Sequence, residues 1–410
     1  MITDRRRLPL GTIALGIFII ATPVLASDEL VDHRAPLVTD FLDGTYLPSA
    51  EGIIVTGAHG LLGLLKVSTQ GAELTHYPNI PNEDFTSLEK LSDSEVLLGT
   101  SVGKVYLFDG TKVTEVGKLS EYDEPVLDIA VSNGAAWAVG GRGMIAKSAD
   151  GRTWTPVTVT EAMQPQVTIP GTEPGEWYFG VSNLLMDSIV FTANVGGKLA
   201  VAGTDYALYL DEGFVQFIKP IDAEPAPTIE FKFGPGPAFR PGDVSWNVVL
   251  FSGANITLAG EFGMILQSTD GGQSWIRRDT VLSPKEPEPP YWIAGTQKGS
   301  ELYLTGAAGI IRASNDGGAT WTQLPSSGNE GVFGVTITGP GQPAIAGAVG
   351  LIGMLNNGQW ALADRSELQL LSWLKTPVEM PDGTLIMLGG RSTMIALKDG
   401  KWVRIPVTNK

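Results

Sequence analysis

Residues 258–275 read LAGEFGMILQSTDGGQSW, and residues 304–321 repeat the pattern as LTGAAGIIRASNDGGATW. In each stretch an apolar run ends in a glycine, two residues lead to a second glycine and another apolar run, and a Ser-x-Asp-Gly turn precedes a tryptophan. A third copy runs from Gly140 to Trp154 with a shorter turn. Apolar runs separated by such turns predict short β-strands joined as hairpins, repeated along the chain.

The spacing of this repeat predicts the fold class. Eight units can be aligned on their first glycine, and most are 41 to 46 residues apart, with two longer gaps of 63 and 57 residues. A period of this size, made of strands, is that of a four-stranded propeller blade. We therefore expect an all-β chain folded as a β-propeller of eight four-stranded blades, with seven blades as the alternative. The eight glycines are Gly57, Gly99, Gly140, Gly203, Gly260, Gly306, Gly347 and Gly389.

The Ser-x-Asp-Gly turns read as structural elements. An aspartate in such a turn accepts backbone N–H bonds, the glycines permit positive φ, and the tryptophan covers the blade. Because they recur once per blade, these aspartates are expected far apart rather than as a catalytic pair. The turn residues are Ser148, Asp150, Trp154, Ser268, Asp270, Trp275, Ser314, Asp316 and Trp321.

The N-terminus predicts export. Three arginines at 5–7, an apolar stretch at 8–25 and small residues before Ser27 are typical of a signal peptide spanning residues 1–26. An uncleaved signal anchor is the alternative. Residues 27–410 then form a single propeller domain, and the periplasm is the expected compartment. The sequence has no cysteine, which excludes a disulfide framework.

Composition limits the partners. The formal charge of −16 disfavours nucleic acid and direct binding of anionic lipid. The three histidines are widely spaced, so no metal site, cofactor site or catalytic triad is predicted. We expect a monomer that binds a protein partner.

The phase of the repeat predicts where that partner binds. In a four-stranded blade, the turn from strand two to strand three and the connection to the next blade lie on one face, and the Ser-x-Asp-Gly turn lies on the other. Three insertions rich in aromatic residues and proline, at 163–188, 219–246 and 283–292, are expected on the first face. Alternatively, their aromatic side chains fold back over the blades. The predicted partner-binding residues are His59, Arg142, Trp177, Tyr178, Phe179, Asp205, Phe239, Glu261, Tyr291, Trp292 and Arg391.

The repeats at 140–154, 260–275 and 306–321 resemble those of the Asp-box, or bacterial neuraminidase repeat, propellers. Within that group they are most similar to the photosystem II assembly and stability factor-like family. The resemblance implies a non-enzymatic protein that binds subunits of a membrane complex during assembly. For this chain we expect an assembly or accessory factor for a membrane or envelope complex, such as a transporter.

Two other functions remain open. Sialidases share the Asp box, so a glycoside hydrolase or a carbohydrate-binding propeller is the alternative. The resemblance to that family would require an arginine cluster beside a Tyr–Glu pair and an aspartate acid. No arginine motif of that kind precedes the first repeat, and Phe239-Arg240-Pro241 lies between repeats. We therefore predict no enzyme. A small ligand in a central channel is the third possibility.

Overall fold

The computed structural model describes residues 39–159, 162–163, 167–168, 173–178, 189–209, 214–230, 232–233, 244–278 and 290–410. The chain divides into residues 1–35 and a compact unit of residues 36–410, which holds every described residue. Within the described ranges the regular elements are β-strands and short 3-10 turns. None of the helices found there is long and apolar enough to cross a membrane. The expected signal peptide, residues 1–26, lies outside these ranges.

Seven sheets of the described chain contain a meander of four antiparallel strands, and each is one blade. Blade 1 comprises β1 (Asp43–Leu47), β2 (Gly52–Thr56), β3 (Leu62–Val67) and β4 (Ala72–His76). Blade 2 comprises β5 (Phe85–Lys90), β6 (Val96–Thr100), β7 (Lys104–Phe108) and β8 (Val113–Lys118). Blade 3 comprises β9 (Val126–Ser132), β10 (Ala135–Gly140), β11 (Ile145–Ser148) and β12 (Trp154–Pro156). Blade 4 comprises β23 (Trp246–Ser252), β24 (Asn255–Gly260), β25 (Ile265–Ser268) and β26 (Ile276–Arg277). Blade 5 comprises β27 (Trp292–Lys298), β28 (Glu301–Gly306), β29 (Ile311–Ser314) and β30 (Thr322–Gln323). Blade 6 comprises β31 (Val332–Ile337), β32 (Pro343–Gly347), β33 (Ile352–Asn356) and β34 (Gln359–Leu362). Blade 7 comprises β35 (Leu374–Glu379), β36 (Leu385–Gly389), β37 (Met394–Lys398) and β38 (Lys401–Arg404).

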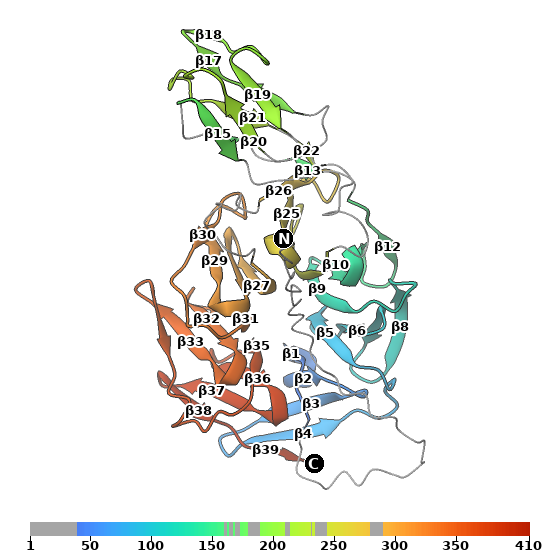
Figure 1. Cartoon of the computed structure of the whole chain (residues 1–410). Coiled ribbons are helices and arrows are strands. Elements are labelled where there is room, and N and C mark those ends of the chain that lie inside the picture. Colours follow the sequence, from blue (N-terminus) through green and yellow to red (C-terminus); the bar gives the residue numbers. More distant parts are fainter. Residues whose placement is uncertain are drawn as a thin grey trace, which may run out of the picture. The chain divides into compact units, whose positions relative to one another are not determined.

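The first strands of the seven blades form a closed ring. Each contacts the first strand of the next blade, from β1 through β5, β9, β23, β27 and β31 to β35, and β35 contacts β1 (Figure 1). The expectation of a β-propeller with four-stranded blades is confirmed.

The expected eighth unit, at Gly203, is not a blade, and the described chain follows the seven-blade alternative. The segment lies in an insertion between β12 and β23 whose strands pair mainly with one another. The sheets are β14 (Val167–Thr168) with β21 (Thr228–Glu230) and β16 (Val190–Thr192), β15 (Gly175–Tyr178) with β20 (Phe214–Phe217) and β19 (Tyr206–Tyr209), and β17 (Asn194–Val195) with β18 (Lys198–Leu199). Two further strands, β13 (Ala162–Met163) and β22 (Lys232–Phe233), extend the sheet of blade 4 beyond β26.

This insertion has its own apolar core, which explains why it forms a separate β-unit. Val215, Phe217 and Ile229 are fully or nearly fully buried there, and Phe191 and Tyr206 pack against them. Its strands pair in separate sheets of two or three strands, so they do not form a four-stranded blade. We call residues 173–178, 189–209 and 214–230 the insertion unit.

Burial between neighbouring blades holds the ring together. Every residue of the second strands β2, β6, β32 and β36 is buried. Between blades 1 and 2, Leu47 and Ile54 pack with Phe85 and Leu98, all of them buried. Each fully buried side chain of this size contributes roughly 1.5–3 kcal/mol. Because each blade buries two faces, no blade is stable alone.

The Ser-x-Asp-Gly turns have the hydrogen bonds that their sequence predicts. In blade 5, Ser314 Oγ donates to Asp316 Oδ1 at 2.7 Å, and the carboxylate accepts the backbone N–H of Thr320 at 2.9 Å and its hydroxyl at 2.6 Å. Asp270 has the same bonds with Ser274 in blade 4. Although partial burial opposes ionisation, these donors lower the pKa of Asp316 to about 2.

We predict that Asp316→Ala lowers the free energy of unfolding by about 1–3 kcal/mol, because the donors of Thr320 lose their acceptor. Urea denaturation at pH 7 measures the change. The matched control is Asp93→Ala, since the Asp93 side chain is 84% exposed and its ion pair with Lys90 spans 3.8 Å. Equal stability of the two variants would contradict this structural role.

The two ends of the described chain meet at blades 7 and 1. The backbone N–H of Phe41 donates to Gly389 O, and that of Ser392 donates to Thr39 O. The last strand, β39 (Val407–Asn409), pairs in parallel with β4 as a fifth strand of blade 1. The ring is thus closed by residues more than 300 positions apart.

Candidate partner-binding face

The glycine turns between the second and third strands set one face of the propeller. In blade 3, the N–H of Gly141 donates to Pro125 O, at the entry of its own blade, and the N–H of Gly143 donates to Val244 O, at the entry of blade 4. Gly60 likewise donates to Glu83 O before blade 2. The turns and the blade connections therefore lie together, as the repeat phase predicts. We call this side the first face.

In six turns the residue before the second glycine, or before the serine that replaces it in blade 7, has a left-handed backbone, with φ between 50° and 56°. In four of these turns the left-handed residue is polar or small. A polar side chain loses little free energy by being exposed, and a small one fits the left-handed conformation with less steric strain. In the other two it is Phe262 or Val349, each with an exposed side chain. The six residues are His59, Arg142, Phe262, Ala308, Val349 and Arg391.

Four predicted binding residues lie in these turns. The N–H of His59 donates to the carboxylate of Asp84 at 2.8 Å, and the imidazole is exposed. Arg142 Nε lies 3.0 Å from Glu124 Oε1. The N–H of Arg391 donates to Asp40 Oδ1 at 2.7 Å. Glu261 accepts the N–H of Ser245 at 2.7 Å, so its carboxylate fixes the turn.

Asp205 lies elsewhere. The sequence placed it on a blade turn, but the structure places it in the insertion unit, because the segment around Gly203 is not a blade. Asp205 is buried and accepts Lys219 Nζ at 2.6 Å and the N–H of Val201 at 2.9 Å. The Lys219 ammonium and this N–H lower its pKa. Its contacts are those of a structural ion pair.

Tyr291 and Trp292 separate at the entry of blade 5. Tyr291 is 42% exposed, and its hydroxyl hydrogen-bonds Asn247. Trp292 is completely buried in the interface with blade 4, and the guanidinium of Arg312 lies over its ring at 5.5 Å. Trp292 therefore cannot contact a partner in this structure, and it is left out of the binding surface.

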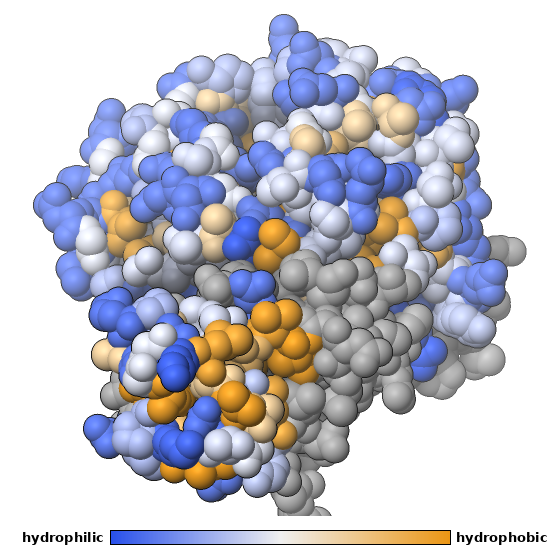
Figure 2. Space-filling model, turned by 90° about the horizontal axis from the view of Figure 1, so that it is seen from above, coloured by the Kyte–Doolittle hydropathy of each residue, from blue (hydrophilic) through white to orange (hydrophobic). Residues whose placement is uncertain are grey.

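Trp177 belongs to the core of the insertion unit. It is half-buried and packs against Phe217, with ring centroids 6.4 Å apart. These contacts lie within the insertion unit and not over the blades. The backbone of Tyr178 pairs with Phe214; the Tyr178 side chain, Phe179 and Phe239 lie outside the described residues. Exposed apolar residues of the unit are instead Val190, Leu199, Val201, Tyr209 and Ile218. Figure 2 shows that hydrophobic residues gather on part of the molecular surface.

We predict that Trp177→Ala destabilises the insertion unit by about 2–4 kcal/mol, because it removes a large ring from a small core. Hydrogen exchange should accelerate in residues 189–230 while the seven blades keep their protection. Leu199→Ala is the control, since Leu199 is exposed on the same unit. Unchanged exchange in the Trp177 variant would favour its role as a free contact residue.

Sequence reasoning missed the apolar residues of the first face. Phe262, Val349 and Leu371 are 60%, 59% and 89% exposed, and Tyr122 is also exposed. Phe262 and Val349 each precede the second glycine of a turn, which was the available signal. Leu371 and Tyr122 lie in the connections before blades 7 and 3 and carry no such mark.

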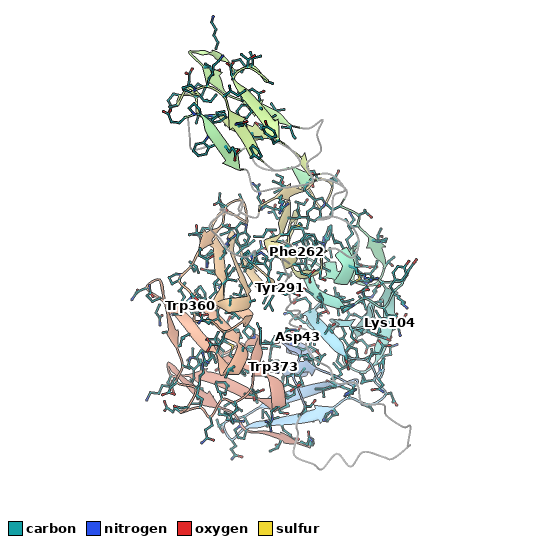
Figure 3. All side chains as sticks on the ribbon, in the orientation of Figure 1. Asp43, Lys104, Phe262, Tyr291, Trp360 and Trp373 are labelled. Atoms are coloured by element: carbon teal, nitrogen blue, oxygen red, sulfur yellow. The ribbon has the colours of Figure 1, made fainter. Side chains whose placement is uncertain are left out.

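The first strands also bring three carboxylates into the centre of the ring. Asp43, Glu89 and Asp128 lie on β1, β5 and β9, with Lys375 of β35 as the accompanying cation. Burial raises the pKa of all three acids. It raises that of Asp128 to about 7 and, with repulsion from Asp128 and Asp43, that of Glu89 to about 8. Figure 3 shows Asp43 near the centre of the ring, whereas Lys104 lies on blade 2 farther out.

Six of the seven first strands of the described chain have a register shift near their first residue. Such a bulge re-aims the side chain of the extra residue. Three of these side chains reach a neighbouring blade or cross the ring. Thr86 donates to Val126 O, Asn247 donates to Trp292 O at 2.7 Å, and Lys375 Nζ donates to Thr86 O at 3.4 Å.

The three acids of the first strands, Asp43, Glu89 and Asp128, predict that stability depends on pH. Glu89 keeps its proton in the fold to about pH 8, whereas in the unfolded chain it ionises near pH 4.5. Folding therefore binds protons between these values, and stability falls as the pH rises through this window. We expect Glu89→Gln to flatten this decline and to stabilise the fold at pH 8 by more than about 1 kcal/mol.

Urea unfolding from pH 5 to pH 8.5 tests this effect. Glu367→Gln is the control, because Glu367 is exposed in the connection before blade 7. A Glu89 variant as steep in its pH dependence as the native chain would contradict the burial of this carboxyl.

Comparison with known proteins supports the fold. The family model of photosynthesis system II assembly factor YCF48 matches residues 238–352. The structure of YCF48 bound to D1 peptide is 12% identical, with a TM-score of 0.51, over 88% of this chain and 93% of that one. No curated protein matches the sequence.

Other propellers are equally similar. Virginiamycin B lyase from Staphylococcus aureus is 12% identical, with a TM-score of 0.52, over 82% of this chain and 87% of that one. The WD40 propeller domain of Doa1 is 11% identical, with a TM-score of 0.51, over 88% and 93% of the two chains. At these identities the likeness shows the fold, and the matched enzymes and binding proteins share it.

Proposed function

Because the chain is a β-propeller related to the photosystem II assembly factor YCF48, we propose that it binds a protein partner through its first face and performs no catalysis. We propose further that it is an exported assembly or accessory factor for a membrane or envelope complex, such as a transporter. The periplasmic location rests on the N-terminal sequence pattern, and a monomer is the expected state.

One observation carries the proposal. Apolar side chains stand exposed on the turns and connections of the first face, and carboxylates border them. The exposed residues are Phe262, Tyr291, Val349 and Leu371, and the neighbouring acids include Glu261, Glu330 and Glu367. Exposed apolar side chains that are bordered by carboxylates and held on a rigid scaffold are typical of a protein-binding surface.

The arrangement of arginines favours binding over a sialidase-like site. Such a site needs arginines together in one pocket, but Arg142 and Arg391 lie on turns of blades 3 and 7. Arg142 pairs with Glu124, and Arg365 pairs with Glu330 at 2.8 Å. The guanidinium groups of Arg142 and Arg365 are therefore already paired with carboxylates of this chain. A carbohydrate-binding role has no such counter-argument and stays the alternative.

The neighbouring structure of YCF48 is a complex with a D1 peptide. That propeller therefore accommodates a peptide, and the same mode of recognition supports a peptide segment as the ligand here. The lyase neighbours show that the fold also hosts enzymes.

The proposal is tested by affinity capture. We expect the chain from Ser27, immobilised through its C-terminus, to retain a specific membrane or envelope protein from detergent-solubilised native envelopes, identified by quantitative mass spectrometry. Leu371→Ser should reduce this capture at least fivefold, because Leu371 is almost fully exposed and contributes little to packing. Leu362→Ser, on the outer strand β34, is the control.

Retention of no envelope protein by the native chain would count against the function. Release of a modified sugar by the purified chain would favour the glycoside hydrolase.

A further inference from the structure

The turns of blades 4 and 6 on the first face each hold a bulky apolar residue that is both left-handed and exposed. Phe262 has φ 56° and Val349 has φ 52°, a left-handed conformation that is unfavourable for bulky and β-branched residues. Both side chains are also exposed, at 60% and 59%. A strained conformation and an exposed apolar group each cost free energy, so packing does not explain these residues. Such a conflict between sequence and structure marks a site kept for contact with something else.

Two further exposed residues lie beside these turns. The turn of Phe262 abuts the entry of blade 5, where a Cβ on Gly263 would lie 2.8 Å from Pro290, next to Tyr291. The turn of Val349 abuts the entry of blade 7, where a Cβ on Gly350 would lie 2.4 Å from Leu370, next to Leu371. We call Phe262, Tyr291, Val349 and Leu371 the apolar arc. It follows consecutive blades, 4 to 7, and Figure 3 shows Phe262 and Tyr291 near the centre of the ring.

The segments that carry and flank the arc are acidic. Residues 260–263, 290–291, 324–331, 347–350, 363–373 and 389–392 contain four carboxylates, of Glu261, Glu330, Asp364 and Glu367, and two arginines. One of these, Arg365, is held by Glu330. Four carboxylates against two arginines give these segments a net formal charge of −2.

We infer that the apolar arc docks a segment of the partner protein that carries aliphatic or aromatic side chains together with lysine or arginine. This inference rests on the proposed function and names the chemistry of its ligand. The apolar side chains cover Phe262, Tyr291, Val349 and Leu371, and the cation faces the surrounding carboxylates. Electrostatic complementarity steers such a segment to the face and orients it.

Charge also decides against a second copy of this chain. Two such faces would bring carboxylates against carboxylates, and the whole chain has a formal charge of −16. Like charges brought together across an interface oppose association. The occupant must be of opposite sign.

The test uses substitutions that relieve strain. Asparagine tolerates the left-handed conformation, so Phe262→Asn combined with Val349→Asn should leave the melting temperature unchanged or raise it. A random twelve-residue peptide library displayed on phage is selected on the immobilised native chain. The most enriched peptide is then synthesised with a fluorescein label and titrated by anisotropy at 50 and 300 mM NaCl.

We expect the selected peptides to be enriched in both apolar and basic residues. The double variant should bind the labelled peptide at least tenfold more weakly. Asp399→Asn, which places the same residue at a left-handed position of the turn between β37 and β38, should bind it as the native chain does. Replacing the basic residues of the peptide by glutamine should weaken binding and remove most of its salt dependence.

The inference is overturned if the double variant binds equally well, if the selected peptides lack basic residues, or if no peptide is enriched. The outcome is separable from that of the proposed function. Capture of the same envelope protein by the double variant at native levels would leave that function standing and reject the arc. Failure of the native chain to capture any envelope protein would reject the function, and the peptide titration would still decide on the arc.

Discussion

The propeller depends on how its first strands satisfy their unpaired edge. Each first strand pairs with the second strand of its own blade and turns its other edge to the centre, where backbone groups would lack partners. Side chains of the preceding blade supply them. Asp43 accepts the N–H of Leu88, and Asp128 accepts the N–H of Val249, in both cases at 2.8 to 2.9 Å. The side-chain amide of Asn247 likewise donates a hydrogen bond to the carbonyl of Trp292 in the next blade.

These interactions place polar groups where the ring is narrowest. A carboxylate that holds a neighbouring strand must be buried, and its pKa rises as a result. Asp43, Asp128 and Glu89 thus form a group of acids with Lys375 as the accompanying cation. The same rigid ring fixes the turns and connections of the first face, so that Phe262 and Val349 can be held in strained, exposed positions. The rigid ring and the exposed apolar side chains on its first face are two results of one architecture.

Much of this fold is readable from the sequence, because the glycines and the Ser-x-Asp-Gly turns each demand a particular backbone conformation. The blades at Gly140, Gly260 and Gly306 are found this way. Gly203 is misleading, since a turn glycine does not reveal whether its flanking strands join one four-stranded sheet or separate smaller sheets. The exposure of Tyr291 and the burial of Trp292 also could not be predicted, because the register shift that follows sets the phase of the strand. Charged Glu261 looks like the exposed residue of its turn, yet its carboxylate is bound by Ser245 and Phe262 is the more exposed of the two.

The pairing of β39 with β4 bears on the order in which the chain acquires its structure. Blade 1 contains the first described strand and the last, and Thr39 and Phe41 bond to residues of blade 7. A chain made from its N-terminus must therefore leave one face and one edge of blade 1 open until the final residues emerge. Contacts of such long sequence separation form late and slowly. The first blade to be synthesised is therefore the last to be completed.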